Sequence, residues 1–164
     1  MAAQFALEES RDRYIDLYEF APTGYLTFTD KALITVVNLT AAVLLGVERN
    51  DLVNHGLGRF IAPGDHEVWD QYFTDLLNQG KKLTCTLTLM RGDGSTFPAR
   101  LEGVRTSSSG GTTTIRIAIS DITDIWQITA LQEREEKYRR LFETAQDGII
   151  IVEEETGKII DVNT

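Results

Sequence analysis

The sequence predicts an α+β fold: one five-stranded antiparallel sheet with helices on one face and a further amphipathic helix at each end. Three observations lead to this prediction. Two short apolar strands form an early hairpin, a region of helical periodicity follows, and three strands then alternate between apolar and polar residues. Such alternation is typical of antiparallel strands that bury one face. The order of these segments therefore favours helices packed over a single sheet.

The first hairpin joins residues 25–29 to residues 32–37 around Asp30-Lys31. Asn38 then suits a helix N-cap, because its short side chain can accept a hydrogen bond from a free amide of the first turn. Gly46 suits the left-handed position that ends such a helix. A short helix over residues 39–45 is the prediction.

A longer amphipathic helix is predicted over residues 66–79, with Asp65 as its cap and Gly80 at its end. Its apolar side chains recur at helical spacing and define one face. They are Val68, Trp69, Tyr72, Phe73, Leu76 and Leu77.

The remaining strands cover residues 83–89, 97–104 and 113–120. In the first of them Leu and Cys85 alternate with Thr, and the turn that begins at Arg91 ends it. The last strand runs through alternating isoleucines into a charged helix, where apolar residues again follow helical spacing.

Composition limits the function classes. A net charge of −9 gives nucleic-acid binding little support. No apolar run is long enough for a membrane span or a signal peptide. The single cysteine, Cys85, excludes an internal disulfide, and no Cys/His spacing suits a metal, so we expect a cytoplasmic protein.

An internal repeat relates the two ends of the chain. Residues 7–24 return as residues 131–148, and both copies continue through a strand and a turn to Val-Asn, at Asn38 and Asn163. We interpret the unit as a helix plus a domain and expect the chain to be a piece of a longer tandem array. The predicted parts are a connecting helix (1–20), a domain (21–124), a linker helix (125–145) and the start of a second domain (146–164). That last segment, a hairpin without its neighbours, is expected to be disordered or to pair with another chain or with the edge of the first domain.

Several motifs, weak alone but ordered, resemble those of a PAS domain, the sensory module found in tandem in signalling proteins. They are Tyr14–Gly24 before the hairpin, Asn38 with Gly46, Arg49-Asn-Asp-Leu-Val53, Phe60-Ile-Ala-Pro-Gly-Asp65, Arg91-Gly-Asp-Gly94 and Asp121-Ile-Thr-Asp124. The resemblance implies a five-stranded sheet, a small internal cavity, and a signal leaving through Asp121, Ile122 and Thr123 into a coiled coil. It also implies a contact between Asp121 and Arg91.

No cofactor, metal or catalytic residue is predicted. Trp69 stands where the haem-binding members of the family carry their histidine, with His66 a turn earlier, and the photoadduct motif Asn-Cys-Arg of the flavin-binding members is missing. Catalytic motifs such as HExxH or a P-loop are also missing. The inner positions leave two alternatives, a core filled by its own side chains and a pocket for a small apolar ligand. These positions are Phe28, Val36, Trp69, Phe73, Cys85, Leu87, Phe97, Leu101 and Ile117.

The flanking helices predict a homodimer, because their apolar residues follow the alternating three- and four-residue steps of a coiled coil. The predicted seam consists of Leu7, Tyr14, Ile128, Leu131, Tyr138 and Phe142, with a break at Glu135. An exposed connector is the structural alternative. We expect the sensory and dimerisation part of a two-component sensor histidine kinase, with the output domain in the same polypeptide. The alternatives are a protein-interaction scaffold, or the input of a diguanylate cyclase or of a transcription regulator.

Overall fold

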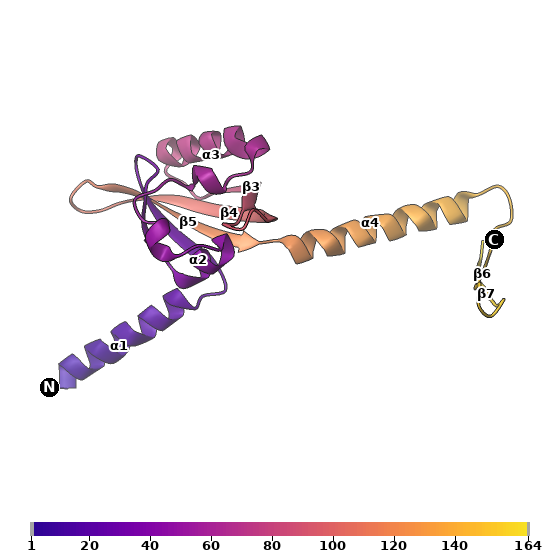
Figure 1. Cartoon of the computed structure of the whole chain (residues 1–164), viewed down its shortest axis with the longest axis horizontal. Coiled ribbons are helices and arrows are strands. Elements are labelled where there is room, and N and C mark those ends of the chain that lie inside the picture. The colour runs from indigo at the N-terminus through magenta and orange to yellow at the C-terminus, as the bar shows by residue number, and fades with distance from the viewer. Residues whose placement is uncertain (1, 164) are drawn as a thin grey trace. The chain divides into compact units, whose positions relative to one another are not determined.

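The computed structural model describes residues 2–163, and the chain divides into two compact units between Thr123 and Asp124 (Figure 1). In chain order the first unit contains α1 (Ala2–Glu19), β1 (Gly24–Thr29), β2 (Ile34–Val37), α2 (Leu39–Leu45), the short 3-10 helices η1 (Arg49–Asp51), η2 (Leu57–Phe60) and η3 (Pro63–Asp65), α3 (His66–Gln79), β3 (Leu83–Met90), β4 (Thr96–Ser107) and β5 (Thr113–Asp121). The second contains α4 (Thr123–Thr144), which begins at the division, β6 (Ile150–Val152) and β7 (Ile159–Val162).

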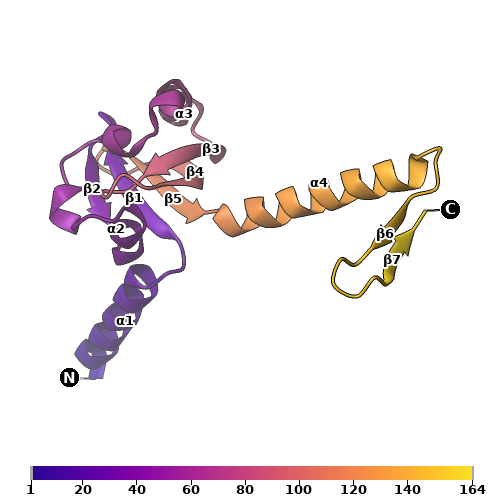
Figure 2. The same ribbon diagram turned by 45° about the vertical axis from the view of Figure 1, so that its right-hand side comes forward.

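The first unit is built on the predicted five-stranded sheet, with strand order β2-β1-β5-β4-β3 and antiparallel neighbours throughout. The pairing of β1 with β5 joins the first and last strands of the domain, and Gly24 lies opposite Ile119. Helix α3 runs alongside β3 and β4 in both views (Figures 1 and 2). The α+β architecture is therefore confirmed.

The core lies between the sheet and its helices. The inward side chains of β5, Ile115, Ile117 and Ile119, are buried, and the rings of Phe28 and Phe73 pack edge to face with centroids 5.7 Å apart. Alternation places these side chains on one face of each strand, and the apolar face of α3 covers them.

The predicted caps of α2 are present. The Asn38 side chain accepts a hydrogen bond from the Ala41 amide at 3.0 Å, and Gly46 adopts a left-handed conformation with φ of 66°. Asp65 differs from the prediction, because its carboxylate accepts from the Thr88 amide at 2.7 Å and makes no cap hydrogen bond to α3. Val68, which was expected on the buried face of α3, is exposed.

The assignment of Val36 to the inner face was wrong. Thr27 pairs with Val36, whereas Phe28 pairs with Ile34, so Thr35 is an extra residue in β2. A bulge of this kind shifts the alternation of the strand by one position. Ile34 and Val37 consequently point into the core, and Val36 is 47% exposed.

In the second unit, β6 and β7 pair with each other in an antiparallel hairpin. This differs from the prediction that residues 146–164 are disordered or pair with another chain or with the edge of the first domain. The difference arises because the hairpin is held by its own helix: Asn163 donates to the Phe142 carbonyl at 2.9 Å, and Phe142 is buried.

Within the described residues, no helix combines the length and the apolar composition needed to cross a membrane.

Gly103 lies in β4 directly beneath side chains of helix α3. A Cβ at this position would lie 2.7 Å from Leu76 Cδ1 and 2.7 Å from the Tyr72 hydroxyl, which donates to the Leu83 carbonyl. We expect Gly103→Ala to lower the free energy of unfolding by about 1–3 kcal/mol, because well-packed cores resist added volume. Urea denaturation measures this change.

Gly58→Ala is the matched control, because no atom lies within 4 Å of the added Cβ. Equal stability of the two variants would contradict the close packing of α3 on β4.

Candidate functional site

The predicted relay residues meet where β5 ends. Asp121 closes β5, and Arg91 lies in the turn between β3 and β4. Arg91 Nη2 and Asp121 Oδ2 are 3.3 Å apart, and each side chain is 29% exposed. The expected contact is therefore present as a partly exposed ion pair. We call Arg91, Phe97 and Asp121 to Thr123 the exit junction.

Packing on three sides positions Arg91. Its guanidinium carbon lies 4.2 Å from the centroid of the buried Phe97 ring, within the range of a cation–π interaction. Its backbone amide donates to the Ser95 carbonyl at 2.8 Å, and the next amide, of Gly92, donates to the Leu45 carbonyl at 2.9 Å. The turn is thus attached to the end of α2, and a side chain at Gly92 would collide with the Gly46 carbonyl at 2.8 Å.

Asp121 connects this turn to the start of α4. While Oδ2 pairs with Arg91, Oδ1 accepts from the backbone amide of Thr123 at 2.9 Å and from the Thr123 hydroxyl. Between them the Ile122 amide donates to the Pro98 carbonyl at 3.0 Å, and the Ile122 side chain is buried. One carboxylate therefore joins the β3–β4 turn to the first residue of the helix.

The positions predicted for an apolar pocket form a packed core. The rings of Phe28, Trp69 and Phe73 lie with centroids 5.5–5.9 Å apart. The other members that lie in this core are buried or, for Cys85, half-buried. They are Cys85, Leu87, Phe97, Leu101 and Ile117.

Haem binding concerns Trp69 and His66, and thiol chemistry concerns Cys85. Trp69 is 5% exposed, while His66 is exposed at the start of α3. Burial raises the pKa of the Cys85 thiol to about 11, so the reactive thiolate is scarce at neutral pH. No group of three or more His, Cys, Asp or Glu side chains suited to a metal ion occurs in the described part of the chain.

A groove of about 830 Å³, which was not predicted from the sequence, lies on the opposite face of the sheet. Tyr14 and Tyr18 of α1 stack with centroids 6.3 Å apart, and Tyr18 stacks on Tyr25 of β1 at 5.9 Å. Burial and the adjacent Glu19 carboxylate raise the pKa of Tyr18. Val36 and Val104 add apolar surface. Val104, an apolar residue at a predicted outward position of its strand, was the signal available in the sequence.

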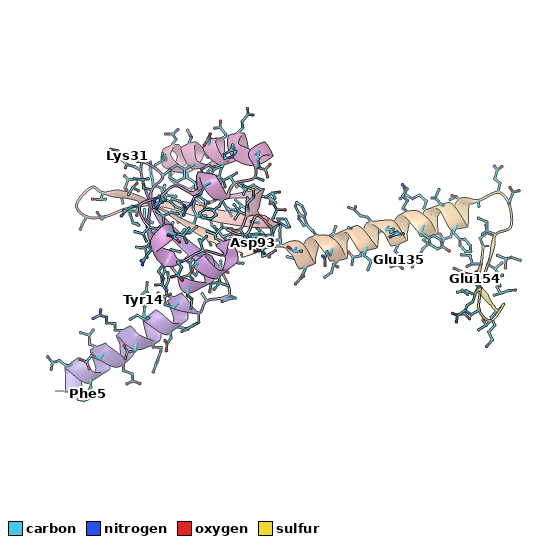
Figure 3. All side chains as sticks on the ribbon, in the orientation of Figure 1. Phe5, Tyr14, Lys31, Asp93, Glu135 and Glu154 are labelled. Atoms are coloured by element: carbon cyan, nitrogen blue, oxygen red, sulfur yellow. The ribbon has the colours of Figure 1, made fainter. Side chains whose placement is uncertain are left out.

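Most of the predicted seam residues are exposed. Leu7 and Tyr14 on α1, and Ile128, Leu131 and Tyr138 on α4, have exposed fractions from 48% to 70%. Figure 3 shows Tyr14 on α1 and the break residue Glu135 on α4. Phe142 differs: it is 8% exposed because it packs within its own unit, where its ring stacks on Tyr138 at 5.8 Å. Its assignment to a free dimer face was wrong.

Known structures share this fold. The PAS domain of an HTR-like protein from Haloarcula marismortui aligns with a TM-score of 0.63 at 21% identity, over 74% of this chain and 98% of that one. A PAS domain of a two-component sensor histidine kinase aligns at 0.58 and 13% identity, over 70% and 97%. The PAS domain of nitrogen regulation protein NR(II) from Vibrio parahaemolyticus aligns at 0.53 and 16% identity, over 66% and 96%.

Family comparison gives the same result from the sequence. No curated protein matches the chain. A family model described as PAS domain matches residues 22–124, and a second model with the same description matches residues 136–164. The chain therefore belongs to the PAS domain family, with a partial second PAS domain after the first.

Proposed function

We propose that this chain relays a signal from its PAS domain through the exit junction into α4, as the sensory and dimerisation part of a signalling protein. The observation that carries the proposal is the Asp121 carboxylate, shared between Arg91 and Thr123. A shift of the β3–β4 turn changes the position of Arg91 and therefore the partner available to Asp121. The start of the helix then changes direction or register, which is the class of movement that packed elements transmit.

The energy scale suits a relay. A partly exposed ion pair contributes roughly 0–1 kcal/mol, so breaking it leaves the buried core intact. Coupling between sites typically amounts to about 1–3 kcal/mol, and a small number of such contacts supplies it. The exit junction therefore responds to a modest stimulus without unfolding.

A sensor histidine kinase is our preferred context, with the output domain in the same polypeptide. One of the similar structures supports it, since that structure is a PAS domain from a two-component sensor histidine kinase. The inputs of a diguanylate cyclase and of a transcription regulator are the alternatives. A cytoplasmic location belongs to the same proposal and rests on composition.

We further propose a homodimer formed through the flanking helices. Leu7 on α1 and Leu131 on α4 leave most of their apolar surface exposed, and they occupy the same position of the repeat. The tyrosine-lined groove adds a second apolar surface beside α1. Apolar surface at coiled-coil spacing is buried when two such helices pair.

An interaction scaffold is the second candidate. The packed aromatic core supports it, because Phe28, Trp69 and Phe73, at positions predicted to line an apolar pocket, lie with their ring centroids within 6 Å of one another. The groove on the other face would then hold a protein partner.

The relay predicts a specific effect of Asp121→Ala. The domain should stay folded, with a loss of about 1 kcal/mol or less, while stimulus-dependent output in a reporter assay of a polypeptide with its output domain should be lost. Asp70→Ala is the matched control, since it removes an exposed carboxylate of α3 outside the exit junction. Normal regulation in Asp121→Ala would refute the relay.

Native mass spectrometry distinguishes a sensor of small molecules from a scaffold. A filled core predicts the bare chain mass after purification and no adduct from a metabolite panel. A retained small apolar molecule that is released on denaturation would instead establish a ligand pocket.

Dimerisation through the flanking helices predicts that Leu7→Glu and Leu131→Glu each raise the dissociation constant at least about tenfold, equivalent to about 1.4 kcal/mol. Sedimentation equilibrium measures the constant. Ala6→Glu adds the same charge to an exposed position of α1 outside the seam and should have little effect. A monomeric wild-type chain at all concentrations would refute the dimer.

A further inference from the structure

Asn38 makes contacts well beyond its role as a helix cap. Its amide group donates to the Tyr18 carbonyl at 2.8 Å and to the Thr23 carbonyl at 3.1 Å. Its oxygen accepts from the Tyr25 amide at 2.8 Å and from the Ala41 amide at 3.0 Å. The side chain is fully buried, and both its donors and both its acceptor positions are used.

Asn163 repeats this arrangement in the second unit. Its amide donates to the Phe142 carbonyl at 2.9 Å and to the Asp147 carbonyl at 3.2 Å, and its oxygen accepts from the Ile149 amide at 2.6 Å. Each of these partners lies 124 positions after its counterpart around Asn38. Three of the four side-chain hydrogen bonds of Asn38 thus have a counterpart at Asn163.

In both units the bonded carbonyl belongs to the last turn of the preceding helix, Tyr18 in α1 and Phe142 in α4. The final carbonyls of a helix have no partner within the helix and must find one elsewhere. The asparagine supplies that partner. It also forms hydrogen bonds with the backbone at the start of the first strand of the domain. The helix end and the strand therefore cannot move apart without breaking several hydrogen bonds together.

Further groups strengthen the joint in the first unit. The Glu19 carboxylate accepts from the Leu39 amide at 2.9 Å and pairs with Arg49 at 2.7 Å, and the Thr40 hydroxyl donates to the Ala21 carbonyl at 2.6 Å. The start of α2 thus holds the end of α1 at several points. By contrast, the start of α4 depends on the partly exposed Arg91–Asp121 pair and the short Ile122 segment.

We propose that Asn38 and Asn163 are positioning residues that latch the end of each connecting helix to the PAS domain that follows it. A movement that begins at the exit junction is then carried along α4 and delivered to the second domain at Asn163. This inference rests on the relay proposed above and assigns its receiving end.

Hydrogen–deuterium exchange on the whole chain tests the latch. Serine keeps an oxygen that can cap a helix but lacks the amide donors. We expect Asn163→Ser to increase exchange at least fivefold over residues 139–144 and Asn38→Ser to do so over residues 15–20, with β4 and β5 unchanged. Asn78→Ser, at an exposed position of α3, is the matched control.

Unchanged exchange at the helix ends would overturn the latch, as would an equal increase throughout the strands, which indicates loss of general stability. If Asn38→Ser unfolds the first unit, Asn163→Ser decides the result, because it lies in the other unit.

Output measured in a polypeptide that carries its output domain separates the two proposals. Loss of regulation in both Asp121→Ala and Asn163→Ser supports both. Loss in Asp121→Ala with normal regulation in Asn163→Ser overturns the latch alone, and normal regulation in both overturns the relay.

Discussion

The antiparallel pairing of β1 with β5 is the constraint on which the rest of the domain depends. It brings together segments about 90 residues apart in sequence, and closing so long a loop costs entropy that buried side chains must repay. The isoleucines of β5 supply that burial. Because Gly24 then faces Ile119, the start of β1 and the end of β5 lie at the same end of two neighbouring interior strands. Both helix joints follow from this register.

The two joints of the first unit differ in physical kind. Asn38 is a buried amide with every hydrogen-bonding position used, so loss of one partner leaves a buried donor or acceptor unpaired and costs the full desolvation penalty of that group. The Arg91–Asp121 pair is open to water, which replaces either partner at little cost. We therefore expect the joint between α1 and the first domain to be stiff, and the joint between that domain and α4 to be more easily deformed. A relay needs both properties.

Sequence patterns predicted the parts of the fold that depend on local chemistry. Alternation located β3 to β5, and Asn38 and Gly46 marked the two ends of α2 correctly. The prediction for Val36 was wrong because a one-residue bulge in β2 changes which side chains of the strand face the core. The composition of the strand does not reveal such a bulge. The prediction for Phe142 was wrong because helical spacing cannot distinguish an exposed residue that packs on a partner helix from a residue that is covered by the hairpin of its own unit. The hydrogen bonds from the Asn38 and Asn163 amides to the helix carbonyls could not be predicted from local patterns either, since they join residues about 20 positions apart.

Glu135 affects two properties of α4 differently: the stability of the helix itself and its pairing with a second helix. The Glu135 carboxylate pairs with Arg139 at 3.0 Å within the same helix, an i,i+4 contact that supports helix formation. At the equivalent repeat position α1 carries Arg11, so each connecting helix places a charge in its predicted seam. A charge in the seam weakens association between helices, because pairing must remove it from water. It does not weaken the helix itself. In the relay that we propose, such a helix stays rigid along its axis while its pairing is easy to rearrange, so we expect a small displacement at the exit junction to rearrange it.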